Sequence, residues 1–194
     1  HNSDPTKHYK VSMNQFAALT PSEYKQMLGF KPNLSPVNSK KANLPKKSTQ
    51  KAAENLDWRE KGVVNAVKNQ LACGSWWAFS AIQAAESAYA ISTGTLLSLS
   101  EQNLVDCVEL CHGCSGGLMT DAYNYVINHQ GGKFNTESEY WYISFKESCY
   151  FEKYEKVGSI STYINIAKGD EDDLAEKIEN YGPAAVAVDA SSIW

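Results

Sequence analysis

Residues 69–80 form the one stretch of this sequence whose residue types and spacing suit a reactive site. The stretch passes from the polar pair Asn69-Gln70 through small residues into an apolar run that starts at Trp76. Ser75 is a residue type that caps helices, so the pattern predicts a helix that begins just after it. A side chain at such a helix start can carry chemistry, because the helix dipole stabilises negative charge there. Trp76, however, has no group that can act as a nucleophile.

The cysteines are a second set of reactive groups: Cys73, Cys107, Cys111, Cys114 and Cys149. Four of them can pair in disulfides and one is left over, which favours an oxidising compartment over the cytosol. Cys111 and Cys114 also form a C-x-x-C motif, but there is no second ligand pair for zinc and no preceding thioredoxin-like strand. A haem attachment motif would need His where Ser115 stands. We therefore expect Cys114 to be paired elsewhere, Cys111 to be a surface thiol, and no metal or other cofactor.

The helix predicted after Ser75 should bury one stripe of its surface and end at Gly94, a residue suited to the left-handed conformation of a helix C-terminus. The stripe has the spacing of an amphipathic helix and comprises Ala78, Ala81, Ile82, Ala85, Ala88 and Tyr89. So many alanines predict that neighbouring elements pack closely against this helix.

The other elements follow from periodicity and from residues that cap or break helices. We expect a short helix capped by Thr20 or Ser22 with Pro21 in its first turn, a helix after Ser98 and Ser100, a helix over 118–127, a half-buried strand over 157–167, a helix over 170–181 and a short strand over 184–188. Glu23 lies three residues after Thr20, which is the spacing of a capping box. Residues 31–55 carry six Lys and three Pro but no aromatic residue, which is typical of an exposed linker.

The composition describes a globular chain with two oppositely charged parts. Its 194 residues with 43% hydrophobic content suffice for one substantial core. The sequence has no run of about 18 apolar residues and no signal peptide pattern, so we expect no contact with a membrane. Residues 1–55 carry a net charge of +6 and residues 56–194 one of −10. The front lysines are scattered and lack interleaved aromatics, so we interpret them as facing the acidic part of the chain and not nucleic acid.

Several motifs, taken in order, resemble the papain family of cysteine peptidases. They are Asp57-Trp58-Arg59, Val67-Lys68-Asn69-Gln70, Cys73-Gly74-Ser75-Trp76-Trp77-Ala78-Phe79-Ser80, residues 98–107 and Gly113-Cys114-Ser115-Gly116-Gly117. The third of them is similar to the C-G-[SA]-C-[WY] signature of that family. Gly117-Leu118-Met119 resembles the cathepsin L-like members in particular.

This resemblance implies an α+β, papain-like fold of two domains, a helical left domain and a β-barrel right domain. The peptidase domain would cover residues 56–194, and its right domain would be truncated. Residues 1–55 would be part of the family's inhibitory propeptide followed by a linker, because Asn14 and Phe16 resemble the core of the propeptide motif G-x-N-x-F-x-D. In that family the propeptide blocks the cleft, so we expect Met27-Leu28-Gly29-Phe30 to lie in it.

The same resemblance assigns roles to residues of the site. Position 76 corresponds to the thiol nucleophile, and Gln70 corresponds to the amide that donates to the oxyanion. Gly116 and Gly117 would offer backbone groups to a substrate strand. The walls of a pocket for an apolar side chain would be Leu118, Met119 and Ala187, and the disulfides would join Cys73 to Cys114 and Cys107 to Cys149. Structural interpretations stay open beside these roles: Gln70 as a capping side chain, Leu118 and Met119 as core residues, and the two glycines as turn residues.

Departures from the family pattern predict that this chain is catalytically inactive. Trp76 cannot form an acyl-enzyme, and its bulk should fill the space of the scissile carbonyl. The family's His and Asn are expected about 130 to 150 residues after the nucleophile, yet 118 residues follow Trp76. His112 and His129 come too early to replace that His. Further positions that differ from the family are Ser12, Ala18, Leu71 and Trp141.

Two alternatives to an inactive proenzyme-like homologue stay open. In one, the chain is a fragment or an erroneous form of an active thiol endopeptidase that cuts where an apolar residue stands two positions before the cut. In the other, it is a non-catalytic peptide-binding or inhibitor scaffold. We expect a peptide or protein substrate, or the chain's own propeptide, in the cleft. A partner chain carrying the missing C-terminal part is a further hypothesis, and the expected location is the lysosome or vacuole or outside the cell.

Overall fold

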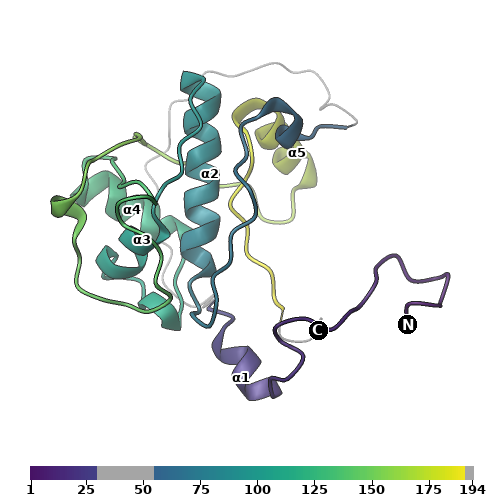
Figure 1. Ribbon diagram of the computed structural model, residues 1–194. Coiled ribbons are helices and arrows are strands. Elements are labelled where there is room, and N and C mark those ends of the chain that lie inside the picture. Colours follow the sequence, from purple (N-terminus) through teal and green to yellow (C-terminus); the bar gives the residue numbers. More distant parts are fainter. Residues whose placement is uncertain (30–54, 191–194) are drawn as a thin grey trace.

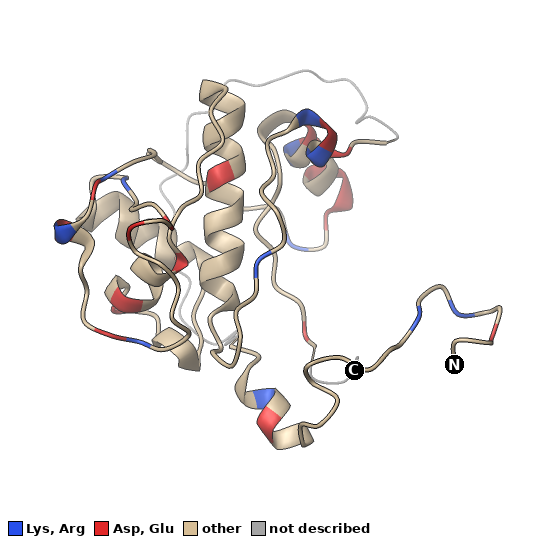
Figure 2. Cartoon of the chain, viewed as in Figure 1, with Lys and Arg blue, Asp and Glu red and all other residues tan. Residues whose placement is uncertain are grey.

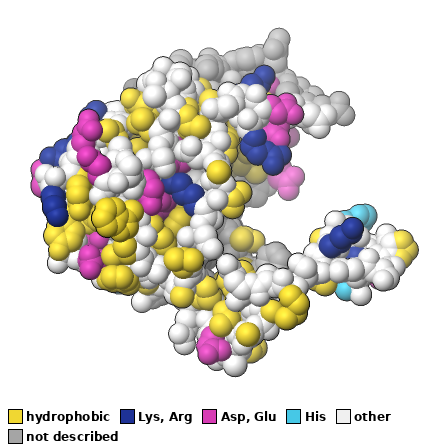
Figure 3. Space-filling model, in the orientation of Figure 1, with side chains coloured by type: hydrophobic (Ala, Val, Ile, Leu, Met, Phe, Trp, Pro, Cys, Tyr) yellow, Lys and Arg dark blue, Asp and Glu magenta, His cyan; other side chains and the backbone are white. Residues whose placement is uncertain are grey.

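The computed structural model describes residues 1–29 and 55–190, and its longest helix, α2, is the central element (Figure 1). The helices are α1 (Pro21–Gln26), α2 (Trp76–Thr93), α3 (Glu101–Cys107), α4 (Met119–His129) and α5 (Glu171–Tyr181), with 3-10 turns at Trp58–Lys61, Gly113–Ser115 and Phe151–Lys153. α3 and α4 pack against one side of α2, and α5 lies on the other side. α1 lies near the N-terminal end of α2, and the residues before α1 extend away from the body (Figure 3). Within the described ranges, no helix combines the length and the apolar character that crossing a membrane requires.

The hydrophobic core lies between α2, α3 and α4. Trp77 and Ile82 from α2, Leu104 from α3 and Val126 from α4 are fully buried in it. The alanines of α2 are small enough for the neighbouring helices to approach closely, as the sequence predicts. The α2 members of this core come from the N-terminal half of the helix, and the candidate site lies at the same end.

The buried face of α2 differs from the predicted stripe. The members of the stripe that are buried are Ala78, Ala81, Ile82 and Ala85. Ala88 is exposed, contrary to the prediction, and Tyr89 is only partly buried, whereas Glu86 and Ala90 are buried. Glu86 is inside because it pairs with Lys68, with 3.1 Å between Nζ and Oε1. A pattern of hydrophobic residues cannot reveal such a partner from another segment.

Most helix ends lie where the capping residues predict them. Thr20 and Glu23 form the predicted capping box of α1, and Ser100 caps α3. Gly94 ends α2 in the left-handed conformation, with φ of 76°. Ser75 occupies the N-cap position of α2, but its side chain does not cap the helix, so this part of the prediction is wrong.

The strands predicted over 157–167 and 184–188 are not formed in the described residues. The β-pairing found there consists of isolated bridges that pair Leu99 with Thr136 and Phe134 with Val157. An alternating pattern produces a strand only where a neighbouring segment pairs with its backbone over several residues. Here the pairing of the first predicted strand ends after one bridge, so the alternation alone is not enough.

Candidate functional site

The front segment, residues 20–29, lies in a cleft formed by two loops of the body. The first loop is residues 62–75, before α2, and the second loop is residues 108–118, between α3 and α4. From the first loop, Gln70 donates a side-chain N–H to the Met27 carbonyl, with 2.8 Å between Nε2 and O. From the second loop, Gly117 donates its backbone N–H to the Gly29 carbonyl at 3.0 Å. Both donors bind backbone carbonyls, so the cleft holds this piece of peptide by its main chain and not by its side chains.

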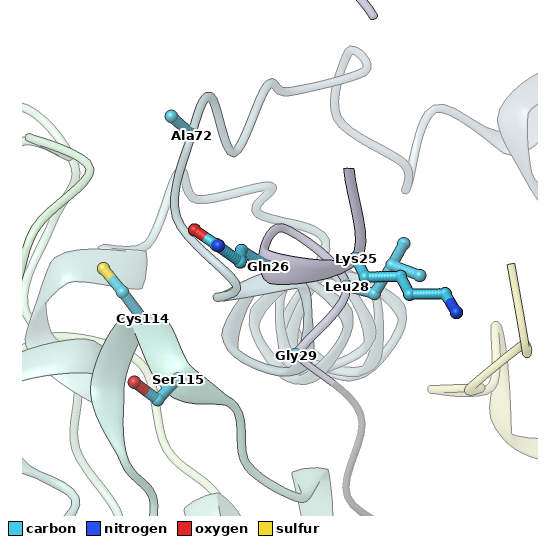
Figure 4. A pocket seen from close by; sticks show the side chains of 7 residues that line it. All are labelled: Lys25, Gln26, Leu28, Gly29, Ala72, Cys114 and Ser115. Atoms are coloured by element: carbon cyan, nitrogen blue, oxygen red, sulfur yellow. The ribbon is translucent and has the colours of Figure 1, made fainter. Parts of the chain in front are cut away.

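A cavity of about 470 Å³ remains beside the front segment. The residues that line it come from the front segment and from both loops: Lys25, Gln26, Leu28, Gly29, Ala72, Cys114 and Ser115 (Figure 4). In Figure 4, Gln26 points toward the side on which Ala72 and Cys114 lie, whereas Lys25 points to the opposite side. The front segment thus covers the cleft without filling it.

Glycines allow the front segment to approach the two loops closely. A Cβ atom at Gly29 would lie 1.9 Å from the Gly74 carbonyl oxygen, and a Cβ atom at Gly116 would lie 2.2 Å from the Gly29 carbonyl oxygen. Neither position can therefore carry a side chain while the segment is in place. Gly116 also has φ of 113°, a conformation that favours glycine. Gly74 is a contact residue of the cleft that the predicted site does not include.

Gln70 and Trp76, the predicted oxyanion donor and nucleophile position, lie on the loop that leads into α2 and at the start of α2. The amide nitrogen of Gln70 also donates to the Cys73 carbonyl at 2.8 Å, which fixes the amide group in place. Trp76 is the first residue of α2 and is partly exposed. An amide donor and a helix start are two groups that stabilise negative charge on a carbonyl oxygen. The indole of Trp76 supplies no nucleophile.

Tyr142 is a residue of the site that the sequence does not reveal. Its hydroxyl donates to the backbone carbonyl of Gln70 at 2.8 Å, and the hydroxyl oxygen of Ser75 lies 2.5 Å from the Tyr142 hydroxyl oxygen. This contact explains why Ser75 does not cap α2. Tyr142 lies 72 residues after Gln70 in a loop rich in tyrosine, and no local pattern distinguishes one of these hydroxyls from another.

A buried charge cluster anchors the chain just before Gln70. The ammonium of Lys68 lies 2.6 Å from Glu101 Oε1 and also pairs with Glu86, and both carboxyl side chains are 1% exposed. Glu86 is the one charged residue of α2, seen as the single red stretch of this helix in Figure 2. Burial raises the pKa of Glu101 to about 8, although the Lys68 charge acts in the opposite direction. The cluster therefore ties the first loop to α2 and α3.

The disulfides join Cys73 to Cys114 and Cys107 to Cys149, which are the pairs that the resemblance implies. The first of them connects the two loops of the cleft. Cys111 is the free cysteine, but it is buried and not a surface thiol as the sequence suggested. It packs in the core beside Gly117, where a Cβ atom would lie 2.6 Å from its sulfur. Within residues 1–29 and 55–190, no group of three or more His, Cys, Asp or Glu side chains is placed to hold a metal ion.

Cys111 should resist alkylation in the folded protein. Burial raises the pKa of its thiol to about 12 from an ordinary 9.0, so the reactive thiolate is about a thousandfold scarcer at neutral pH. Mass spectrometry after iodoacetamide treatment should find no adduct on the native chain and one adduct per chain after unfolding without reductant. Equal labelling rates in the two states would contradict the buried position of Cys111.

The three predicted pocket residues do not surround the cavity. Met119 packs against the hydrophobic core, and Leu118 is the N-cap residue of α4. Ala187 is exposed in the segment after α5. None of them lines the cavity beside the front segment, so their role as pocket walls stays a prediction. Phe30, the last residue predicted in the cleft, lies outside the described residues.

Comparison of the sequence with known proteins identifies related enzymes. A sequence model of papain family cysteine proteases matches residues 52–194. Cysteine proteinase 15A from Pisum sativum is 41% identical over 201 aligned positions, which cover 98% of this chain and 53% of that protein. Cathepsin S from Bos taurus is 38% identical over 188 positions, which cover 94% of this chain and 55% of that protein. The chain thus spans about half the length of the curated relatives that it matches.

Solved structures of related enzymes share the fold of this chain. The digestive procathepsin L2 proteinase from the larval midgut of Tenebrio molitor superposes with a TM-score of 0.76 at 35% identity, over 90% of this chain and 57% of that one. The digestive procathepsin L 3 of the same tissue superposes with a TM-score of 0.71 at 34% identity, over 89% of this chain and 54% of that one. The chain therefore has an α+β papain-like fold and belongs to the papain family of cysteine proteases, among its cathepsin L-like members.

Proposed function

We propose that this chain is a papain-family domain in proenzyme form whose cleft binds peptide backbone without cutting it. Residues 1–55 act as a partial inhibitory propeptide and linker, and residues 56–194 act as the peptidase-like part. The observation that carries the proposal is the pair of hydrogen bonds from Gln70 and Gly117 to backbone carbonyls of the front segment. A substrate peptide would need the same two donors, so the front segment and a substrate compete for one site.

Trp76 is the reason to propose binding without hydrolysis. In this family a thiolate at the start of α2 attacks the peptide carbonyl, and the helix dipole keeps that thiol ionised. The indole of Trp76 has no proton to lose at physiological pH and no sulfur to form an acyl-enzyme. The rest of this part of the site is present, because Gln70 still directs an amide N–H into the cleft.

A second candidate function is that of an active thiol endopeptidase whose position 76 is Cys. The intact surroundings of position 76 favour it: the Gln70 donor, the Cys73–Cys114 disulfide and the start of α2 are all in place. Such an enzyme would cut where an apolar residue stands two positions before the scissile bond. For either function, the two disulfides support a location in the lysosome or vacuole or outside the cell.

A hydrolysis assay tests whether the chain with Trp76 cuts peptides. The Gly29→Ala variant, in which the front segment no longer fits the cleft, is incubated with a fluorogenic peptide carrying an apolar residue two positions before the cleaved bond. We expect no turnover and no adduct with an epoxide thiol reagent, because no accessible thiol is present. The same variant with Trp76→Cys serves as the labelling control, since a thiol at a helix start is reactive. Turnover without that second change, stopped by the epoxide, would overturn the proposal of a non-cutting domain.

A further inference from the structure

The hydroxyl of Tyr142 connects Gln70 in the first loop of the cleft to Ser75, the residue just before α2. It lies 2.8 Å from the backbone carbonyl oxygen of Gln70 and 2.5 Å from the hydroxyl oxygen of Ser75. A carbonyl can only accept, and a phenol has a single hydrogen. Tyr142 therefore donates to Gln70, and Ser75 donates to Tyr142. The result is a directional chain of hydrogen bonds from the start of α2 to the first loop of the cleft.

This chain of hydrogen bonds leaves Gln70 with little freedom. Its backbone carbonyl is held by Tyr142, and the Cys73 N–H also donates to that carbonyl, at the longer distance of 3.4 Å. Its side-chain nitrogen donates to the Cys73 carbonyl and to the Met27 carbonyl, each at 2.8 Å. With the backbone and one N–H fixed, the other N–H is aimed into the cleft.

Tyr142 is itself held rigidly enough to serve as an anchor. Its ring meets the ring of Phe79 on α2 edge to face, with centroids 4.8 Å apart. Its backbone N–H donates to the carboxylate of Glu137 at 2.9 Å. Ser75, at the other end of the contact, is fully buried. The position of the hydroxyl is therefore set by α2 and by the loop of Glu137.

We infer that Tyr142 is a positioning residue of the cleft, which holds the Gln70 amide in the direction that a peptide carbonyl requires. The inference rests on the proposed function, because it concerns the same capture of backbone carbonyls by Gln70. Tyr142 makes no contact of its own with the front segment among the described hydrogen bonds. It acts through Gln70 and through the start of α2.

The test compares Tyr142→Phe with Tyr123→Phe in the full chain. Both variants lose one tyrosine hydroxyl that bonds to a backbone carbonyl, and Tyr123 donates to Ala81 of α2 at 3.0 Å, away from the cleft. The readouts are the NMR shifts of the Gln70 side-chain amide and the exchange rate of the Gly117 N–H, which is bonded to the front segment. Tyr142→Phe should shift the Gln70 amide and speed Gly117 exchange by about threefold to tenfold, the effect of one lost hydrogen bond. Tyr123→Phe should lower the melting temperature without moving either readout.

Two further variants make every outcome decisive. Ser75→Ala removes the donor to Tyr142 with little change in volume, and it should move the Gln70 amide in the same direction even if Tyr142→Phe fails to fold. Gln70→Ala should speed Gly117 exchange directly. If Gln70→Ala has this effect while Tyr142→Phe and Ser75→Ala leave the Gln70 region unchanged, the inference about Tyr142 is wrong and the proposed function stands. If Gln70→Ala has no effect, the proposed function itself fails.

Discussion

Gly29→Ala should expel the front segment from the cleft. The added methyl group would lie 1.9 Å from the Gly74 carbonyl oxygen and 3.1 Å from its Cα, and these backbone atoms cannot turn aside as a side chain would. Gly74 is itself fixed, because its N–H donates to the Cys114 carbonyl at 2.9 Å. The Cys73–Cys114 disulfide holds the same two loops together. The strain is therefore relieved by moving the segment and not the loops.

Hydrogen exchange of the Gly117 amide measures this release. The amide is bonded to the Gly29 carbonyl at 3.0 Å, so it exchanges only when the segment leaves. Overpacking costs about 1–3 kcal/mol, so we expect exchange to become about fivefold faster or more. Ala18→Ser changes an exposed residue just before the segment and should leave this rate unchanged. If Gly29→Ala also left it unchanged, the segment would not occupy the cleft in solution.

Local signals predicted the elements well, because the helix ends are determined by neighbouring residues. The capping box of Thr20, the cap of Ser100 and the C-terminal Gly94 each depend on contacts within a few residues. The strand predictions failed because neighbouring residues alone do not determine a strand. Residues 157–167 have the right alternation, but a strand depends on a distant partner, and the alternation contains no information about whether one is present.

The site was only partly predictable for a related physical reason. The resemblance pointed to Gln70 and Gly117, but it did not show that they bind the carbonyls of Met27 and Gly29. The roles of Tyr142 and of the buried carboxyl groups depend on packing between segments far apart in the sequence. A glutamate on a helix is normally read as part of a solvated face, and its burial becomes visible only when its lysine partner is placed beside it.

The free energy of unfolding should fall as pH rises from about 4.5 to about 8, because burial raises the pKa of Glu101 in the folded chain. The charge of Glu137 adds to the effect of burial on Glu101, because two neighbouring carboxylates repel each other. The groups that face them are Lys68 and Glu86, so three carboxyls meet one ammonium. Because these buried carboxyls face a single positive charge, Glu101 keeps its proton more readily than an exposed glutamate does. Burial raises the pKa of Glu101 to about 8.

Glu137→Gln should weaken this pH dependence. Between the ordinary Glu pKa of 4.5 and the raised value of about 8, the folded chain binds one proton more than the unfolded chain. Stability then declines by up to about 1.4 kcal/mol per pH unit. A glutamine at 137 can still accept from the Tyr142 N–H but carries no charge, so the pKa of Glu101 should move down toward its ordinary value. Urea unfolding at about pH 5 and about pH 8 measures the decline. Glu109→Gln, at an exposed position, should keep the full decline, and an equal decline in both variants would mean that Glu137 does not raise the pKa of Glu101.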